Sequence, residues 1–472
     1  MQILSKNSTK VYPAVPTQHQ VLYLAAPDHF VRPKHVAMLF LFSAKQDGTE
    51  VIPSYHLKES LTKLLVPFYP LAGRLRRRKD KKLEIVCNDD GAEFIEVQVD
   101  ASLEDMGISV LSLEYSELLN PSPKFFDDSI LRCPLLYVQV VDVSLGICGT
   151  LSVPCKRVLI FVEVTRFACG GAALVFALNH TALDGMSVGH FSNAWSEIAT
   201  GREISLQPFH NRTLLKSNCP PGPQFQPPEL RVISQELAPA ASHLEPSCLS
   251  PAERMFTFSP EQLKKLKSKA SQGLERGYFS TFESINAHVW RSITRSRGLD
   301  FSKKTKFLTT LDIRKRVKPA LPDGYIGNGI CFVSASATVG DILQNPLSFA
   351  ANRIREAISS FTEEDMHSVF AWTEQQEGTI VMNVNTGDSA GQDVAVSSWI
   401  RMKCYHLDFG SGKPIFVGPC GNPYDGNVIM LPSHKGEGYM NIFIGLNPKH
   451  MELLEKDSEF LEAEESSKFN GF

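Results

Sequence analysis

A long irregular segment near the middle of the chain divides the sequence into two halves. Residues 207–251 are rich in proline, serine and asparagine and show little hydrophobic periodicity. A stretch of this length without periodicity is typical of a linker or a functional crossing loop. The chain, at 472 residues, is also longer than one hydrophobic core usually fills. The sequence therefore predicts an N-terminal domain (1–206) and a C-terminal domain (252–472) joined by this segment.

Composition and charge indicate an ordinary globular protein and give no reason to expect a nucleic-acid partner. Hydrophobic residues make up 43% of the chain, charged residues 21%, and the formal net charge is −3. No apolar run reaches the roughly 18–20 residues of a membrane span, and the N-terminus lacks the apolar core of a signal peptide. The ten cysteines are scattered, without zinc-site spacing, as expected of reduced thiols. We expect a cytoplasmic protein that binds no metal.

A histidine lies between a predicted buried strand and a predicted helix. The apolar run at 172–178 has the length of a buried strand, and the hydrophobic spacing of residues 188–198 predicts a helix. His180 therefore lies in the kind of strand-to-helix turn where functional groups gather in α/β sheets. Its ordinary pKa suits a general base, and Asp184 could orient it or brace the loop. This spacing alone does not separate an active-site base from a packed histidine.

Other patterns predict the surrounding framework. Hydrophobic spacing predicts helices at 54–68 and 280–298. A third helix is expected directly after Ser259, a suitable N-cap. Two strands are predicted on either side of the "NDDG" turn at 88–91, and the basic cluster at 74–82 is typical of a solvated hairpin edge.

Seven motifs in a fixed order make the chain similar to the plant BAHD acyl-CoA-dependent acyltransferases over nearly its full length. The motifs are "LVPFYPLAGRL" (65–75), "TRFACGGAALVFALNHTALDG" (165–185), "HFSNAWSEIATG" (190–201), "STFESINAHVWR" (280–291), "LDIRKRVKPALPDGYIGNG" (311–329), "SSWIRM" (397–402) and "DFGSGKP" (408–414). The resemblance implies an α/β fold of two similar-sized domains, each a mixed sheet with helices, like chloramphenicol acetyltransferase. An active-site channel would run between the domains.

The resemblance implies direct transfer of the acyl group without an acyl-enzyme. His180 would take the proton of an acceptor hydroxyl or amine, which then attacks the thioester carbonyl. The oxyanion that forms needs a hydrogen-bond donor. By resemblance the candidates are the indole N–H of Trp399 and the hydroxyl of Ser397. A tryptophan that merely packs at the domain interface is the alternative.

The resemblance gives Asp184 a structural role. In the family this aspartate points away from the substrate and pairs with an arginine, which braces the loop. In "LDIRKR", Arg314 and Arg316 alternate, so a strand there would present both on one side. One of these two arginines is the expected partner of Asp184.

The second family motif departs from its usual form in this chain. Asp408, a structural residue by resemblance, and the motif glycines Gly410 and Gly412 are present, but Ser411 stands where the family usually has tryptophan. A small hydroxyl in place of an indole removes packing. Accessory proteins of wax synthesis in this family lose the motif and work without acyl transfer, so a non-catalytic role is the alternative function.

The N-terminal motifs are most similar to the hydroxycinnamoyl-transferring branch of the family. This implies an aromatic acyl-CoA donor, with CoA as part of the substrate, no cofactor and a monomeric enzyme. Family members that act on shikimate or quinate carry an arginine shortly before the Ser-Ser-Trp motif, whereas residues 379–399 here contain no Arg or Lys and Arg401 lies just beyond. A long-chain hydroxy compound therefore rivals shikimate or quinate as acceptor, and a polyamine is a further alternative.

One stretch of the chain looks duplicated. The segment "LLYVQV" ends at Val140 and "TRFACGG" begins at Thr165, and joined directly they would form one continuous family-like strand and turn. The intervening residues 141–164 end in "VLIFVEV", which echoes "LLYVQV", so one copy can fill the strand position and the other is surplus. The insertion is either a surface hairpin, which a fold tolerates readily, or the product of an unspliced intron that is absent from the working protein.

Overall fold

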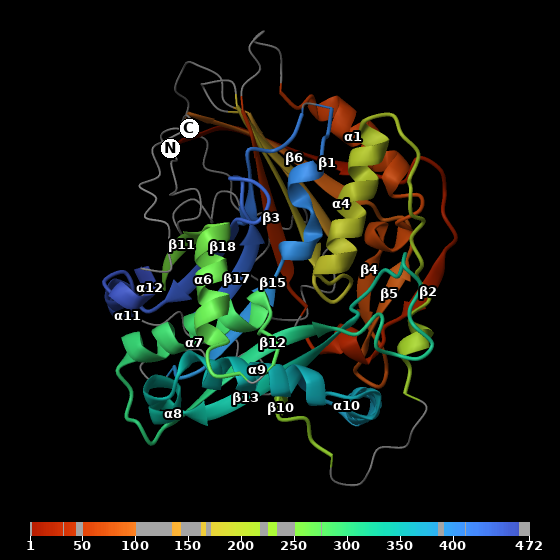
Figure 1. The fold of residues 1–472 in the computed structure, drawn as a ribbon. Coiled ribbons are helices and arrows are strands. Elements are labelled where there is room, and N and C mark those ends of the chain that lie inside the picture. Colours follow the sequence, from red (N-terminus) through yellow and green to blue (C-terminus); the bar gives the residue numbers. More distant parts are fainter. Residues whose placement is uncertain are drawn as a thin grey trace.

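The computed structural model has two halves, each built on a β-sheet with helices packed against it (Figure 1). The structure describes residues 2–31, 33–43, 51–100, 135–142, 162–166, 171–217, 225–233, 251–274, 276–385, 391–410 and 412–461. Both sheets mix parallel and antiparallel pairs, as the α/β prediction requires. Across these ranges, no helix combines the length and the apolar character needed to cross a membrane.

The larger sheet holds the strand that leads to His180. Its strands, in spatial order, are β1 (Gln2–Val11), β6 (Ala92–Asp100), β7 (Leu136–Asp142), β9 (Ala172–Asn179), β3 (His35–Phe42) and β16 (Phe416–Pro419), and β8 (Val162–Arg166) pairs with β6 and β9. Every residue of β9 is buried, and β9 has a sheet neighbour on each side. The strand predicted from the apolar run is therefore confirmed.

Two helices cover one face of this sheet and lie side by side in Figure 1, α1 (Ser54–Leu64) and α4 (Gly185–Ala199). Trp195 of α4 donates its indole N–H to Ser60 Oγ of α1 at 2.9 Å, and its ring packs on Phe176 of β9. Both helices were expected, but α1 ends before Pro67 instead of running to residue 68. The apolar faces of α1 and α4 thus form one core with β9.

A small sheet beside the larger one corrects part of the hairpin prediction. Its strands are β2 (Gln20–Tyr23), β5 (Leu83–Cys87) and β4 (Arg74–Arg77). The strands on either side of residues 88–91 exist, but β5 pairs with β2 and β4, whereas β6 pairs in the larger sheet. The basic cluster occupies the β4–β5 hairpin, whose turn is exposed, while Arg74 is buried against the carbonyls of Gly73 and Gly91.

The second large sheet belongs to the C-terminal half. Its strands, in spatial order, are β11 (Ala252–Phe258), β18 (Met440–Leu446), β17 (Asn427–Pro432), β15 (Val394–Ser398), β12 (Lys304–Asp312) and β13 (Ile330–Thr338). Helices α6 (Pro260–Ala270), α7 (Thr281–Arg297) and α9 (Leu347–Ser360) pack against it. Ser259 caps α6 and Ser280 caps α7, each accepting from a backbone N–H three residues on. α6 appears where its N-cap predicts it, and α7 where its periodicity predicts it.

Further short elements complete this half of the chain. They are α8 (Val339–Gln344), α10 (Glu363–Gln375), the two-stranded ribbon of β10 (Leu230–Ile233) and β14 (Thr379–Met382), η7 (Ile400–Met402), η8 (Cys404–His406), α11 (Pro448–Leu454) and α12 (Ser458–Leu461).

One strand from the C-terminal half of the sequence belongs to the N-terminal sheet. β16 lies in the C-terminal half of the sequence but pairs with β3 of the N-terminal sheet, with Phe416 opposite Leu41 and Pro419 opposite Met38. The N-terminal sheet is therefore completed by residues that lie between β15 and β17 of the C-terminal sheet in sequence. No local pattern predicts this, because β16 is only four residues long and its partner lies far away along the chain.

Two segments of the chain share one edge of β9. Residue Val138 of β7 and residue Val162 of β8 are both opposite Phe176, and this offset of 24 positions holds along Ala173–Phe176. One edge of a strand accommodates one neighbour at a given position. The two segments are thus alternatives for a single place, as the sequence echo predicts, and residues 143–161 between them lie outside the described residues.

Candidate active site

His180 follows β9 directly and lies in a tight turn that leads to α4. Its backbone N–H donates to the Lys34 carbonyl at 2.8 Å, and its carbonyl accepts from Asn328 Nδ2 at 2.9 Å. His180 is half-buried, at the end of a fully buried strand, and its Nδ1 is buried. Burial and the nearby charge of Lys34 lower the pKa of His180 below its ordinary value. A neutral imidazole with an accessible face is what a general base requires.

Asp184 is held by contacts from both halves of the chain. It caps α4 by accepting from the Ser187 N–H at 2.9 Å, and Arg314 grips it in two parallel hydrogen bonds of 2.8 Å each. The backbone N–H of Gly329 adds a further bond at 2.8 Å. Burial alone would raise the pKa of Asp184, but the Arg314 charge and these hydrogen bonds hold it low. Asp184 is therefore a buried carboxylate held by Arg314 and by backbone N–H groups of both halves.

Of the two candidate arginines, Arg314 is the partner, although the expected strand geometry is wrong. β12 ends at Asp312, and residues 313–316 form a turn. Arg316 turns elsewhere and donates to the Ile358 carbonyl at 3.3 Å. Gly329 explains how Arg314 fits, because a Cβ at that position would lie 2.6 Å from the guanidinium nitrogen.

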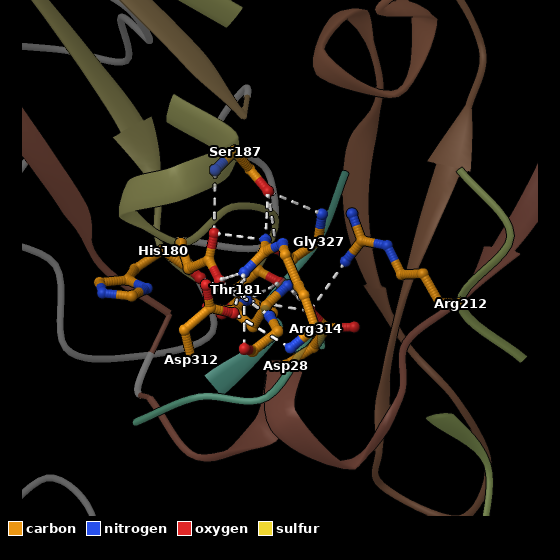
Figure 2. Close-up of polar contacts among 11 residues, drawn as sticks. Asp28, His180, Thr181, Ser187, Arg212, Asp312, Arg314 and Gly327 are labelled. Atoms are coloured by element: carbon orange, nitrogen blue, oxygen red, sulfur yellow. Dashed lines mark hydrogen bonds and ion pairs between the residues drawn. The ribbon is translucent and has the colours of Figure 1, made fainter. Parts of the chain in front are cut away.

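Figure 2 shows the direction of these side chains. The His180 imidazole points away from the cluster in which Arg314, Ser187 and Gly327 meet. Ser187 Oγ donates to the Gly327 carbonyl at 2.8 Å, which ties α4 to the loop before β13. Asp184 therefore stabilises the loop on the side opposite the imidazole. Of its two possible roles, the geometry favours the brace over orientation of the ring.

Trp399 lies where the C-terminal sheet meets the N-terminal core. Its backbone N–H donates to the Met430 carbonyl at 2.8 Å just after β15, and its partly buried side chain packs against the N-terminal core. Three residues on, Met402 lies against Gly185 and Gly189 at the start of α4. Ser397 is half-buried near the end of β15, and Arg401 is exposed on η7. The turn that carries Trp399 thus borders the loop that carries His180.

Asp408 organises the second motif through the backbone. Its carboxylate accepts from the N–H groups of Gly410 and Gly412 at 2.8 and 2.9 Å, and both glycines have positive φ. Its own N–H and carbonyl bond to Ser196 Oγ of α4, each at 2.9 Å. These hydrogen bonds link the motif loop to α4, and the structural role of Asp408 stays a prediction. Ser411 lies outside the described residues.

Three buried polar residues next to the His180 turn were not among the site residues predicted from the sequence. Asp28, Arg212 and Asn328 are buried directly behind the His180 turn and contact its backbone or one another. Asn328 lies in the "GYIGNG" part of a family-like motif, which was the one available signal. Asp28 and Arg212 stand in stretches without a pattern, so only the fold shows their place.

The site residues offer no metal centre. Within the described ranges, no group of three or more His, Cys, Asp or Glu side chains could hold an ion. Among the described cysteines, Cys87, Cys331 and Cys404 are buried free thiols. Burial raises the pKa of the Cys87 and Cys404 thiols to about 12, so neither is an activated nucleophile.

Comparison with known proteins identifies the family. The model of the Transferase family matches residues 1–157 and 150–461. Shikimate O-hydroxycinnamoyltransferase of Nicotiana tabacum is 32% identical over 461 residues, which cover 97% of this chain and 99% of that protein. Hydroxycinnamoyl-CoA:5-hydroxyanthranilate N-hydroxycinnamoyltransferase of Avena sativa is 32% identical over 465 residues, with the same two coverages.

The fold comparison agrees. Vinorine synthase superposes with a TM-score of 0.69 at 21% identity, covering 99% of each chain. That structure has the same two-part fold as this chain. The chain therefore belongs to the Transferase family, the BAHD acyltransferases, and is an enzyme that transfers acyl groups.

Proposed function

We propose that the protein transfers an aromatic acyl group, hydroxycinnamoyl in the first instance, from CoA to a small acceptor, with His180 as general base. The observation that carries this proposal is the position of His180, a half-buried histidine with a lowered pKa, on a turn held by both halves of the chain. The donor class is supported by the two hydroxycinnamoyl-transferring relatives.

The reaction needs no covalent enzyme intermediate. His180 takes the proton of the acceptor hydroxyl or amine while the acceptor oxygen or nitrogen bonds to the thioester carbonyl carbon. The carbonyl oxygen becomes an oxyanion, for which the indole N–H of Trp399 is the proposed donor and Ser397 a second one. The C–S bond then breaks, and His180 passes its proton to the leaving CoA thiolate, which departs as the thiol. We propose that acyl-CoA and acceptor meet in a channel between the halves.

The charge of the site and the activities of the relatives limit the classes of acceptor to be tested. A carboxylate entering a partly dry site needs a paired cation, yet residues 379–399 contain no Arg or Lys. Arg401 is exposed close to Trp399 and is the proposed substitute if shikimate or quinate binds. An uncharged hydroxy compound needs no such partner. The relatives include both O- and N-acyltransferases, so hydroxyl and amine acceptors both enter the test. We propose a cytoplasmic, monomeric enzyme.

The experiment is a product screen followed by one substitution. Purified protein is incubated with coumaroyl-, caffeoyl- and benzoyl-CoA against shikimate, quinate, 5-hydroxyanthranilate, long-chain hydroxy acids and polyamines, and products are detected by mass. With the productive pair, His180→Ala should lower kcat by about 10²–10⁴-fold and leave the melting temperature unchanged. Wild-type turnover by the folded variant would contradict the mechanism. A wild-type protein inactive with every pair would favour the accessory role.

A further inference from the structure

Three buried polar side chains from distant parts of the chain meet behind the His180 turn. Asp28 lies in η1 (Ala26–His29), Arg212 in η5 (Arg212–Leu215) and Asn328 in the loop before β13. Their exposed fractions are 0%, 1% and 0%. The proposed chemistry uses none of them directly. Because buried charged groups are costly unless paired and hydrogen-bonded, their contacts indicate what they do.

Two of these side chains bind three consecutive carbonyls of the turn. Asn328 Nδ2 donates to the carbonyls of His180 at 2.9 Å and Thr181 at 3.3 Å. Arg212 Nη2 donates to the Ala182 carbonyl at 2.8 Å. A backbone fixed at three successive residues cannot rotate the peptide planes that set the direction of the His180 side chain.

Asp28 organises both donors. One of its carboxylate oxygens accepts from the backbone N–H and from Nδ2 of Asn328, each at 2.9 Å, and pairs with Arg212 Nη1 at 3.0 Å. The other oxygen accepts from the Ala25 N–H at 2.9 Å. One hydrogen of the Asn328 amide is thus held by Asp28, which directs the second hydrogen at the carbonyls of the turn. Figure 2 shows Asp28 and Arg212 beside Thr181.

We propose that Asp28 is a positioning residue for His180 and acts through Asn328 and Arg212. The His180 turn is then clamped at two ends by two buried ion pairs, Asp28–Arg212 at its start and Asp184–Arg314 at the cap of α4. The inference rests on the proposed role of His180. Loss of Asp28 should misdirect the imidazole, and a displacement of about 1 Å in a reacting group can cost about 10²-fold in rate.

A matched buried ion pair separates positioning from stability. Arg297 of α7 pairs with Asp425 at 3.3 Å, and both residues are buried. Their hydrogen-bond partners include the Asp393 carbonyl and the Asn447 N–H, all within the C-terminal half. Asp425→Asn therefore breaks a pair of similar burial without touching the His180 turn.

The kinetic test compares Asp28→Asn with Asp425→Asn in the full chain. Both should lower the melting temperature, but only Asp28→Asn should lower kcat, by about 10–100-fold, with KM for the acyl-CoA changed less than about twofold. The double variant Asp28→Asn/Arg212→Met removes the unpaired charge and should recover stability while kcat stays low. Equal kcat for Asp28→Asn and Asp425→Asn would overturn the proposal.

A second readout needs no substrate. Diethyl pyrocarbonate modifies neutral imidazoles, and peptide mass mapping gives the rate at His180. We expect at least about a threefold change in Asp28→Asn and none in Asp425→Asn, since a freed turn alters access to the ring. If His180 of Asp28→Asn is modified at the wild-type rate, the positioning role is overturned. If that rate changes but the wild-type protein shows no acyl transfer, only the proposed function is contradicted. If Asp28→Asn does not fold, Asn328→Ala, which unpairs no charge, gives the same two readouts.

Discussion

The turn that follows β9 and the edge along which β9 pairs with β7 and β8 are fixed by different kinds of contact. At its C-terminal end, the His180 turn has one arrangement, fixed by Asn328, Arg212 and Arg314 through hydrogen bonds to particular atoms. Along the edge opposite β3, β7 and β8 each pair with Ala173–Phe176. The same strand therefore borders a uniquely determined site and a position for which two segments compete.

The difference follows from the kind of contact. Every residue except proline offers the same backbone donor and acceptor, so a strand ladder does not distinguish between two similar segments. Side-chain contacts between a carboxylate, a guanidinium and an amide depend on residue type and geometry, so one arrangement is far more stable than the others. Specificity at β9 therefore comes from polar side chains and not from strand pairing.

The largest effect we expect on the His180 side is loss of activity in acid. Burial and Lys34 lower the pKa of His180, so its neutral form persists below pH 6.5. We expect kcat/KM to be flat near neutral pH and to fall about tenfold per pH unit once the pH drops below that lowered pKa. The same group contributes stability that is present above pH 6.5 and is lost toward lower pH, because the unfolded state binds the proton more readily. An acidic limb centred above pH 6.5 would contradict this environment.

The next largest effect is on stability. Asp184→Asn removes the closer counter-charge of the buried Arg314 and leaves it Asp312 at 3.4 Å, and breaking a buried ion pair typically costs about 3–5 kcal/mol. We expect a clear drop in melting temperature, with activity lowered through loop disorder more than through proton transfer. Thermal denaturation and a pH–rate profile check this. A normal melting temperature with an altered profile would show instead that Asp184 orients the imidazole.

Removing one of the two segments that pair with the same edge of β9 tests most directly whether they are alternatives for one position. On β9, Val140 is opposite Leu174 and Thr165 is opposite Ala173, while on β6 the partners of Val140 and Thr165 are Glu96 and Val97. A chain without residues 141–164 would thus place one continuous strand against both neighbours. We expect this deletion to be soluble and at least as active as the full chain.

Two control deletions sharpen this prediction. Removing residues 138–161 keeps the register but retains the residues of β8, giving "LLYVEVTR", and should also fold. Removing residues 141–163 leaves one extra residue in the strand, which shifts the side chains to the wrong faces or forces a bulge. Solubility, melting temperature and turnover are compared for all three. If the 141–164 deletion fails to fold while the full chain works, the insertion is a structural element and the two segments are not alternatives.

The smallest effect concerns the second motif. Asp408 holds the N–H groups of Gly410 and Gly412, so the loop backbone is specified whatever side chain stands between them. Ser411→Trp restores the residue usual in the family, and we expect an unchanged or slightly higher melting temperature. A marked loss of stability would show that the surrounding wall has packed around serine.

Local patterns predicted the elements but not their long-range partners. The N-cap at Ser259, the apolar strand β9 and the amphipathic helices α4 and α7 all follow from neighbouring residues. Residues 313–316 were expected as a strand because Arg314 and Arg316 alternate, yet the chain turns there so that Arg314 reaches Asp184. Tertiary ion pairing outweighed a weak local pattern.

The sequence by itself determined the order of elements, the family and the histidine most suited to act as a base, because periodicity, caps and motifs are encoded in adjacent residues. Only the tertiary structure decided that β16 completes the N-terminal sheet, that Arg314 and not Arg316 binds Asp184, and that Asp28 stands behind His180. Asp28 and Asn328 are 300 positions apart in sequence. Contacts at such separations are set by how two completed cores meet, and no local pattern carries that information.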